Sequence, residues 1–175
     1  EYNPIGVGLM GFADALIKMG IYYDSQEALD FIDKLGRVYE NETDIIADGQ
    51  ELLPYCIRSI APTGVLSILA DCSSGIEPIF SRDFDRNLGI GQIRETREIY
   101  KSKYAREAHE ISPDWHVKIQ ARFQGFVDNS ISKTCNFSND ASIQDVESAY
   151  MQAWRMGCKG ITIFRDGSKQ NQILT

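Results

Sequence analysis

The stretch 60–80, which reads IAPTGVLSILADCSSGIEPIF, constrains the fold of this chain more than any other part of it. A short apolar run ends at Pro62-Thr63-Gly64, and a second apolar run, Val65–Leu69, follows at once. This pattern predicts a strand that ends in a turn, which then feeds the first turn of a helix. Backbone N–H groups at a helix start have no intrahelical acceptor and, together with the helix dipole, favour an anion. The alternative interpretation is an ordinary strand–turn–helix corner without a ligand.

The predicted phosphate-binding turn has a small residue at its centre and hydroxyl groups on both sides of it. Gly64 leaves room for an oxygen atom to approach the backbone, and the hydroxyls of Thr63 and Ser67 can add hydrogen bonds from side chains. The candidate residues are Pro62, Thr63, Gly64, Val65, Leu66 and Ser67.

Two helical patterns lie in the first part of the chain. Apolar residues share one helical face over Leu9–Ile17, and Gly20 is placed to end that helix. Asp24 and Glu27 have the spacing of a capping box, followed by an apolar helical stripe over Ala28–Tyr39. We therefore expect two consecutive helices before the strand.

The middle of the chain gives a mixed signal. The acidic stretch Glu40–Gln50 is expected to be a loop, and Cys56–Ala61 is expected to be a short buried strand. The segment Arg82–Ser112 is charged and has no single period, so a hairpin and a helix both remain open for it.

From Pro113 onward the pattern predicts a helix, a strand, a capped helix and a final strand. These are a helical stripe that reaches Ile131, the strand Ser132–Phe137, a helix capped by Ser142 and Asp145 and ended by Gly157, and the strand Lys159–Arg165. Helices and strands thus alternate, which is typical of the α/β class. With 175 residues, 43% of them hydrophobic, we expect one domain over residues 1–175.

Charge and composition exclude several classes of partner. The formal charge of −7 and the lack of a Lys/Arg cluster argue against direct binding of nucleic acid. No apolar run approaches the length of a membrane span, which is about 20 residues, and no signal peptide is evident. A cytoplasmic location is expected.

The cysteines and histidines do not form a recognisable metal or catalytic pattern. Cys56, Cys72, Cys135 and Cys158 are too dispersed for a zinc site and are expected to be mainly buried thiols. His109 and His116 lack a partner at metal or triad spacing, so we expect both to be surface or helix residues.

One motif suggests a different function. Gly6-Val7-Gly8-Leu9-Met10-Gly11 has the GxGxxG spacing of a dinucleotide-binding loop, and Asp30 lies about 20 residues downstream. That motif has meaning only after a strand, and only five residues precede it. The alternative is that these glycines allow a helix to pack closely against a neighbour.

Five segments, taken in order, resemble the large catalytic chain of ribonucleotide reductases. IAPTGVLS, SSGIEP and GCKGITIFRDGS are similar to the family segments IAPTGTIS, SSGIEP and GCKGIT-aromatic-RDGS. Ile5–Leu29 and Phe126–Ser142 also resemble family segments, whereas Arg37–Leu53 and Asp83–Ser112 match poorly. The adenosylcobalamin-dependent class is the most similar one.

This resemblance implies a fold and a reaction. The family fold is a ten-stranded α/β barrel, of which this chain would be the C-terminal half, and the family reaction converts ribonucleotides to deoxyribonucleotides by radical chemistry. The turn Pro62–Ser67 would hold the substrate phosphates. The barrel wall beside the substrate would be formed by Ser73, Ser74, Gly75, Ile76, Glu77 and Pro78. Glu77 is acidic, so we expect it to bind backbone donors or a basic partner rather than phosphate.

The resemblance also implies what this chain lacks. The radical cysteine of the family lies in an Asn-x-Cys-x-Glu pattern that does not occur here, so no catalytic residue is assigned and the chain alone is expected to be inactive. The implied cofactor of the complete enzyme is adenosylcobalamin. The implied partners are the ribonucleotide, the remaining N-terminal part of the reductase, and a thiol reductant such as thioredoxin. Ile163 and Phe164 replace the tyrosine pair that relays a radical between subunits, which favours the cobalamin class.

Three other functions remain open at this point. A Rossmann-type oxidoreductase would need a strand before Gly6 and would bind a dinucleotide. A non-catalytic nucleotide- or phosphate-binding module would need only the turn Pro62–Ser67. A non-enzymatic interaction domain would bind no nucleotide at all.

Overall fold

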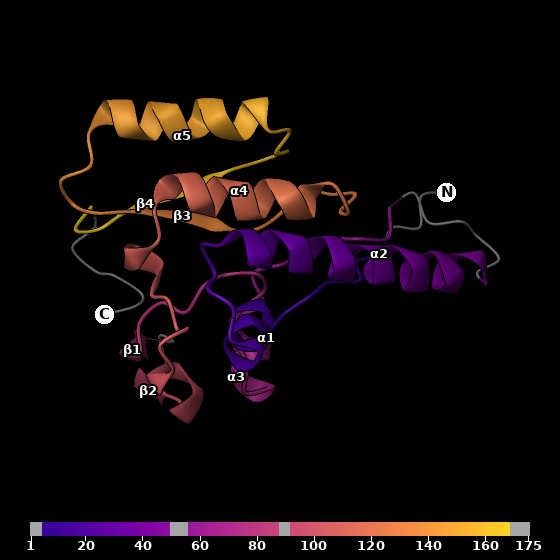
Figure 1. Cartoon of the computed structure of the whole chain (residues 1–175), viewed down its shortest axis with the longest axis horizontal. Coiled ribbons are helices and arrows are strands. Elements are labelled where there is room, and N and C mark those ends of the chain that lie inside the picture. Colours follow the sequence, from indigo (N-terminus) through magenta and orange to yellow (C-terminus); the bar gives the residue numbers. More distant parts are fainter. Residues whose placement is uncertain (1–4, 50–55, 88–91, 169–175) are drawn as a thin grey trace.

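The structure of this chain is a computed structural model that describes residues 5–49, 56–87 and 92–168. The elements are α1 (Phe12–Met19), α2 (Gln26–Asp48), α3 (Gly64–Leu69), β1 (Asp83–Asn87), β2 (Gln92–Thr96), the 3-10 helices η1 (Glu98–Lys101) and η2 (Ala108–Glu110), α4 (Pro113–Gln124), β3 (Thr134–Phe137), α5 (Ile143–Arg155) and β4 (Thr162–Arg165). The chain contains both helices and short strands, and α5 connects the parallel strands β3 and β4, so the predicted α/β class is confirmed (Figure 1).

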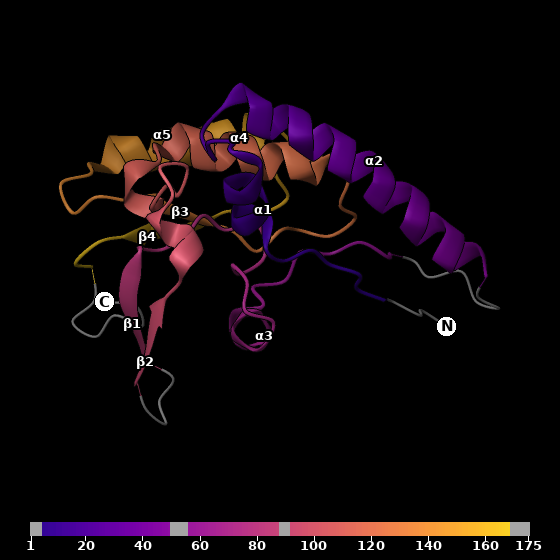
Figure 2. The same cartoon turned by 60° about the horizontal axis from the view of Figure 1, so that its bottom comes forward.

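Four extended segments lie in parallel, side by side. Val7 forms a parallel bridge with Arg58, Ile60 forms one with Ile131, and β3 pairs in parallel with β4. The helices α2, α4 and α5 lie together on one side of these segments, whereas α3 lies on the other side (Figure 2). Parallel segments with helices on the outer face are the arrangement of an α/β barrel wall.

The main core lies between α1, α2, α4 and the extended segment that ends at Ile60. Phe12 and Phe123 pack edge to face, with ring centroids 4.9 Å apart. Each buried side chain of this size contributes about 1.5–3 kcal/mol relative to an exposed one. Ile32 and Ile119 complete the contact between the helices and the extended segment. This core fixes the direction in which the chain leaves Ile60 and enters the predicted turn.

Several predicted helix ends are confirmed. Gly20 ends α1 in the left-handed conformation, with φ +70°, and Gly157 follows α5 with φ +78°. Ser142 and Asp145 form the predicted capping box, because the Ser142 hydroxyl accepts from the Asp145 N–H at 3.2 Å and the Asp145 carboxylate accepts from the Ser142 N–H at 2.8 Å. Local sequence chemistry decides these three positions.

The prediction of a loop over Glu40–Gln50 is wrong for most of that stretch, because α2 continues to Asp48. The buried stripe does not stop at Tyr39 but goes on through Thr43, whose hydroxyl donates to the Tyr39 carbonyl at 2.7 Å. Arg58, from the extended segment, donates to the Thr43 hydroxyl at 3.1 Å. Tertiary contacts therefore stabilise two helical turns that the acidic composition had led us to expect as a loop.

The cap of α2 also differs from the prediction. Ser25, not Asp24, is the N-cap residue, and its hydroxyl accepts from the Ala28 N–H at 3.2 Å. Asp24 instead forms an ion pair with Arg106 at 3.0 Å. A serine next to the aspartate satisfies the helix start and releases the carboxylate for a distant partner.

Three further elements are shorter or different from those expected. Cys56–Ala61 is extended but pairs only through single bridges, at Arg58 and Ile60. The helical stripe that was expected to reach Ile131 ends with α4 at Gln124. In Arg82–Ser112, the structure has the antiparallel hairpin β1–β2 and the 3-10 helices η1 and η2, so the hairpin alternative holds there.

Candidate functional site

The predicted turn is held in an unusual backbone conformation. Thr63 is the N-cap of α3 and has φ 53° and ψ 28°, which is the left-handed region that non-glycine residues rarely adopt. Its hydroxyl Oγ1 accepts a hydrogen bond from the N–H of Gly75 at 2.8 Å. A contact from a second loop therefore stabilises the strained residue at which α3 begins.

The second loop, 73–78, lies directly against the turn. Gly75 has φ +47°, and a Cβ atom there would lie 3.1 Å from the Ala61 carbonyl oxygen, so the two chains approach too closely for most side chains. The hydroxyls of Ser67 and Ser74 are 2.9 Å apart. The two sets of predicted site residues are thus brought together as one unit.

The hydroxyl of Ser67 does not point outward, as the sequence suggested it could. Ser67 is 1% exposed, and its hydroxyl contacts Ser74 and the Gly64 carbonyl oxygen. The side chains of Thr63 and Ser67 therefore hold the two loops together. Outward donors of the turn would have to be main-chain N–H groups.

The outer side of α3 is open. Val65 and Leu66 are 62% and 60% exposed, and their N–H groups lie in the first turn of the helix, where no intrahelical acceptor exists. Figure 2 shows α3 on the side of the molecule opposite to α2, α4 and α5. In a barrel whose helices lie outside, that side is the inner one.

The far end of α3 is held by Arg97, a residue that the sequence did not single out. Its guanidinium contacts Asp14 Oδ2 of α1 at 2.5 Å and Asp71 Oδ1, just after α3, at 2.9 Å. Asp71 is also left-handed, with φ +48°. Arg97 follows the hairpin whose pattern was ambiguous, so only the tertiary structure reveals that it clamps α3 to α1.

Glu77 has the structural role expected of it. Its Oε1 accepts from the Thr134 N–H at 2.5 Å, and its Oε2 accepts from the Lys133 ammonium at 3.0 Å.

Lys133 also contacts His116 Nδ1 at 2.9 Å. Burial and the nearby Lys133 charge lower the pKa of His116 to about 2. His116 was expected to be a surface or a helix residue. It lies in the helix α4, but it is buried in a polar network rather than exposed.

The cysteines are free thiols, but only one is fully buried. Burial raises the pKa of Cys135 to about 12, so this thiol is a poor nucleophile. Cys56, Cys72 and Cys158 are half-buried, which corrects the expectation that the thiols are mainly buried. Within the part of the chain that the structure describes, no group of three or more His, Cys, Asp or Glu residues could hold a metal ion.

The GxGxxG segment does not form a dinucleotide-binding loop. Gly6 and Gly8 lie in the extended segment itself, where an added Cβ would come within 2.8 Å of Ser59 Oγ and 2.7 Å of the Ser59 carbonyl oxygen, respectively. These glycines therefore allow two extended segments, rather than a helix and its neighbour, to lie close together. Gly11 is the left-handed N-cap of α1.

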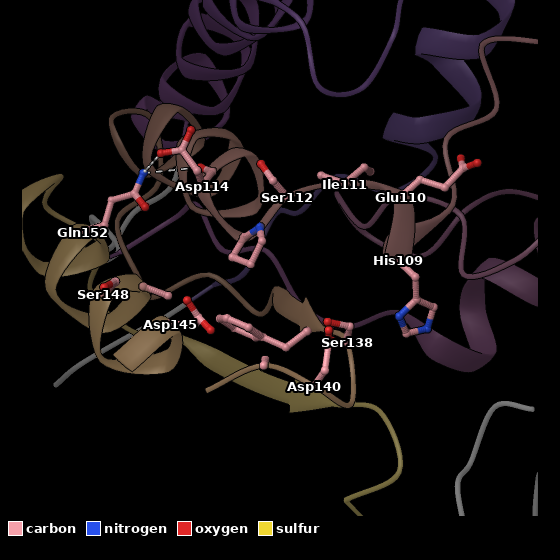
Figure 3. A pocket seen from close by; sticks show the side chains of 14 residues that line it. His109, Glu110, Ile111, Ser112, Asp114, Ser138, Asp140, Asp145, Ser148 and Gln152 are labelled. Atoms are coloured by element: carbon pink, nitrogen blue, oxygen red, sulfur yellow. Dashed lines mark hydrogen bonds between the residues drawn. The ribbon is translucent and has the colours of Figure 1, made fainter. Parts of the chain in front are cut away.

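A cavity of about 540 Å³ lies elsewhere, between η2, the start of α4, the end of β3 and α5. Figure 3 shows Gln152 of α5 reaching toward Asp114 of α4, to which it donates a hydrogen bond at 2.6 Å. No residue of the turn or of the 73–78 loop lines this cavity.

Among the helices that the structure describes, none is both long and apolar enough to cross a membrane.

Parallel extended segments with helices on their outer side define part of an α/β barrel. The family model described as the barrel domain of ribonucleotide reductase matches residues 1–42 and 89–164. This chain belongs to that ribonucleotide reductase family and forms part of its barrel. The resemblance drawn from the sequence motifs is thereby confirmed.

Relatives with curated names agree. The chain is 37% identical to a vitamin B12-dependent ribonucleoside-diphosphate reductase of Thermoplasma acidophilum, across 99% of this chain and 29% of that protein. It is 29% identical to a reductase of the same name from Mycobacterium tuberculosis, across 99% of this chain and 32% of that protein. The chain thus spans about a third, or less, of these relatives.

Solved structures share the fold. The class Id ribonucleotide reductase alpha subunit of Actinobacillus ureae superposes with a TM-score of 0.79 at 17% identity, covering 95% of this chain and 40% of that one. A B12-dependent, class II ribonucleotide reductase gives a TM-score of 0.72 at 15% identity, covering 98% of this chain and 31% of that one.

Proposed function

We propose that residues 1–175 act as one unit, the C-terminal part of the catalytic barrel of an adenosylcobalamin-dependent ribonucleotide reductase. In this proposal the turn Pro62–Ser67 binds the phosphates of the ribonucleotide, and the loop 73–78 forms the neighbouring wall. The observation that carries it is the left-handed Thr63, held by Gly75 at the start of an exposed helical turn. Family membership supplies the reaction, and this geometry supports the place of the substrate.

The turn is suited to a negative group. The N–H groups of Val65 and Leu66 belong to the first turn of α3 and lie at residues that are more than half exposed. Each charge-assisted hydrogen bond from such a donor to a phosphate oxygen contributes about 1.5–3 kcal/mol. Two of them would be enough to orient the phosphate end of a nucleotide. The sugar would then extend toward the remainder of the barrel.

Neither histidine of this chain is placed as a ligand for a cobalamin cofactor. His116 is buried, with one ring nitrogen 3.0 Å from the Ala108 carbonyl oxygen and the other 2.9 Å from Lys133. His109 packs edge-on against the ring of Phe80, with centroids 5.5 Å apart. Adenosylcobalamin, as a source of the radical, would therefore be held by parts of the complete enzyme other than these residues.

The complete enzyme needs groups that this chain does not supply. The radical cysteine and the reducing cysteine pair would come from an N-terminal part of the reductase, and electrons from a thiol reductant such as thioredoxin. Cys135 is not a substitute, because burial raises its pKa to about 12. The names of the two curated relatives favour a ribonucleoside diphosphate as substrate. Nucleotides and thiol reductants of this kind belong to the cytoplasm, which is the expected location.

A nucleotide titration tests the proposed role of the turn. Adding ADP to the ¹⁵N-labelled chain should shift the amide signals of Val65 and Leu66 in a saturable way. Gly64→Asp places a carboxylate where the phosphate would bind, so the shifts should disappear. Unshifted turn amides in the native chain would contradict the proposal.

The matched control is Ile143→Asp. Gly64 and Ile143 are both the first residue of a helix, α3 and α5 respectively, and Ile143 is 82% exposed. Both variants therefore add the same charge at the same helical position, where an acidic group is favourable. Ile143→Asp should keep the native ADP titration. An equal loss in both variants would mean that net charge, not the turn, controls binding.

A further inference from the structure

Lys133 is a fully buried cation whose three N–H donors all have acceptors. The side chain is 1% exposed, and its ammonium lies 3.0 Å from Glu77 Oε2, 2.9 Å from His116 Nδ1 and 2.9 Å from the Thr134 carbonyl oxygen. An ammonium group carries three donors and no acceptor. A charge this deep in the protein is tolerated only when it is paired and hydrogen-bonded in this way.

His116 can serve Lys133 only as a neutral ring. Its Nε2 lies 3.0 Å from the Ala108 carbonyl oxygen, which can only accept, so Nε2 carries the hydrogen and Nδ1 offers its lone pair to the ammonium. A charged imidazolium would have no acceptor to offer. Burial and the Lys133 charge keep the ring neutral by lowering its pKa to about 2. The histidine thus orients the lysine toward Glu77.

Glu77 connects this buried network to the 73–78 loop. Its second oxygen accepts from the Thr134 N–H at 2.5 Å, so the carboxylate is held by both Lys133 and the start of β3. The same loop is held at Ile76, whose carbonyl oxygen accepts from the Tyr23 hydroxyl at 2.7 Å. The loop is therefore fixed at its centre from two directions.

The loop in turn fixes the proposed phosphate-binding turn. Gly75, two residues before Glu77, donates its N–H to Thr63 Oγ1 at 2.8 Å. Thr63 is left-handed, which is strained for a residue with a side chain, and this hydrogen bond is made by that side chain. Movement of Glu77 would therefore reach the first residue of α3 through a short chain of contacts.

We propose that Lys133 and His116 are positioning residues, which hold Glu77 and the 73–78 loop so that Thr63 starts α3 in the geometry needed to bind phosphate. This inference rests on the proposed function of the turn. Stability alone is a poor explanation of the network, because apolar residues of similar volume often replace buried ion pairs without loss of stability. The specific contribution of the network is geometry, transmitted from His116 in α4 and from Lys133, the residue before β3, to a turn that neither residue touches.

The test compares three variants of the full 175-residue chain, probed with ADP and by amide hydrogen exchange. His116→Leu removes the acceptor of the ammonium, whereas His116→Gln restores one acceptor and one donor without a titratable ring. Ala153→Gly destabilises α5, where Ala153 is buried away from the turn. It controls for lost stability.

His116→Leu should raise the Kd for ADP about tenfold and accelerate exchange of the Gly75 amide about tenfold, as loss of a hydrogen bond to a charged group implies. His116→Gln should restore both to near native values, and Ala153→Gly should change neither in spite of a lower Tm. Native Kd and native Gly75 exchange in folded His116→Leu would overturn the inference.

Two further outcomes are also decisive. If His116→Leu does not fold, Glu77→Asp takes its place with the same expected results, because it shortens the reach to Thr134 by one methylene. If the native chain does not bind ADP, the proposed function of the turn is contradicted by that result alone. Exchange of the Gly75 amide then decides the inference: acceleration in His116→Leu supports the positioning network, and an unchanged rate overturns it.

Discussion

Lowering the pH should destabilise this chain through a single buried side chain, His116. The imidazole is 1% exposed, and burial and Lys133 lower its pKa to about 2 in the folded chain. In the unfolded chain the pKa returns to about 6.5. Between these two pKa values His116 binds a proton in the unfolded state but stays unprotonated in the folded state. The stability is therefore fully present above about pH 6.5 and is lost progressively as the pH falls toward about 2.

The magnitude follows from the part of this window that an experiment crosses. One pKa unit corresponds to about 1.36 kcal/mol, and about pH 5 lies about 1.5 units below the unfolded pKa. The free energy of unfolding should therefore fall by about 2 kcal/mol between about pH 8 and about pH 5 from His116 alone. This value hardly depends on the folded pKa, provided that the ring stays neutral at pH 5.

Urea denaturation at the two pH values measures this loss. His116→Gln keeps a donor and an acceptor but cannot titrate, so its loss should be smaller than the native loss by about 2 kcal/mol. His109→Gln is the control, because His109 is exposed in η2, and it should retain most of the native loss. An identical pH dependence in native chain and His116→Gln would refute the reasoning that a neutral, buried His116 serves Lys133.

Three other predictions concern packing, capping and thiol reactivity. Gly36→Ala should lower the free energy of unfolding by about 1–3 kcal/mol, because the added Cβ would lie 2.4 Å from the ring of Phe126; urea denaturation tests this, and native stability would show that the ring can move aside. Ser142→Ala should cost about 1 kcal/mol through loss of the cap on Asp145, which thermal unfolding measures; an unchanged Tm would remove the cap as a stabilising contact. Cys135 should be the last of the four thiols to react with iodoacetamide at about pH 8, because burial raises its pKa to about 12; early modification, detected by mass spectrometry, would contradict its placement in the core.

The elements set by local chemistry could be predicted from the sequence. The end of α1 at Gly20 depends on a glycine that adopts φ +70°, and the start of α5 depends on the reciprocal bonds of Ser142 and Asp145. Outside residues 82–112, the order of helices and extended segments also followed from hydrophobic spacing. These features need only neighbours within a few residues, which a linear pattern displays directly.

The length of α2 could not be predicted in the same way. Its last turns are acidic on the surface, and their stability depends on Thr43 and on Arg58, which approaches from the extended segment. A pattern of surface charge does not reveal such a distant partner. Composition therefore suggested a loop where tertiary contacts make a helix.

In the candidate site, too, the sequence motifs could be recognised, whereas the tertiary contacts between them could not. The turn Pro62–Ser67 and the 73–78 loop stood out as motifs, but the contact that joins Thr63 to Gly75 depends on two left-handed residues meeting in space. Lys133 directly precedes β3, His116 lies on α4, and neither residue carries a spacing signal. Their importance arises from burial, because a buried charge must find all its acceptors.

We propose that this chain supplies the phosphate-binding turn of a ribonucleotide reductase barrel. The most direct test replaces the corresponding segment of the Thermoplasma acidophilum reductase with residues 1–175 and measures reduction of a ribonucleoside diphosphate in the presence of adenosylcobalamin and a dithiol. We predict an active chimera that Gly64→Asp inactivates and Ile143→Asp does not. A folded, cofactor-binding chimera that has no activity, or whose activity survives Gly64→Asp, would contradict the claim.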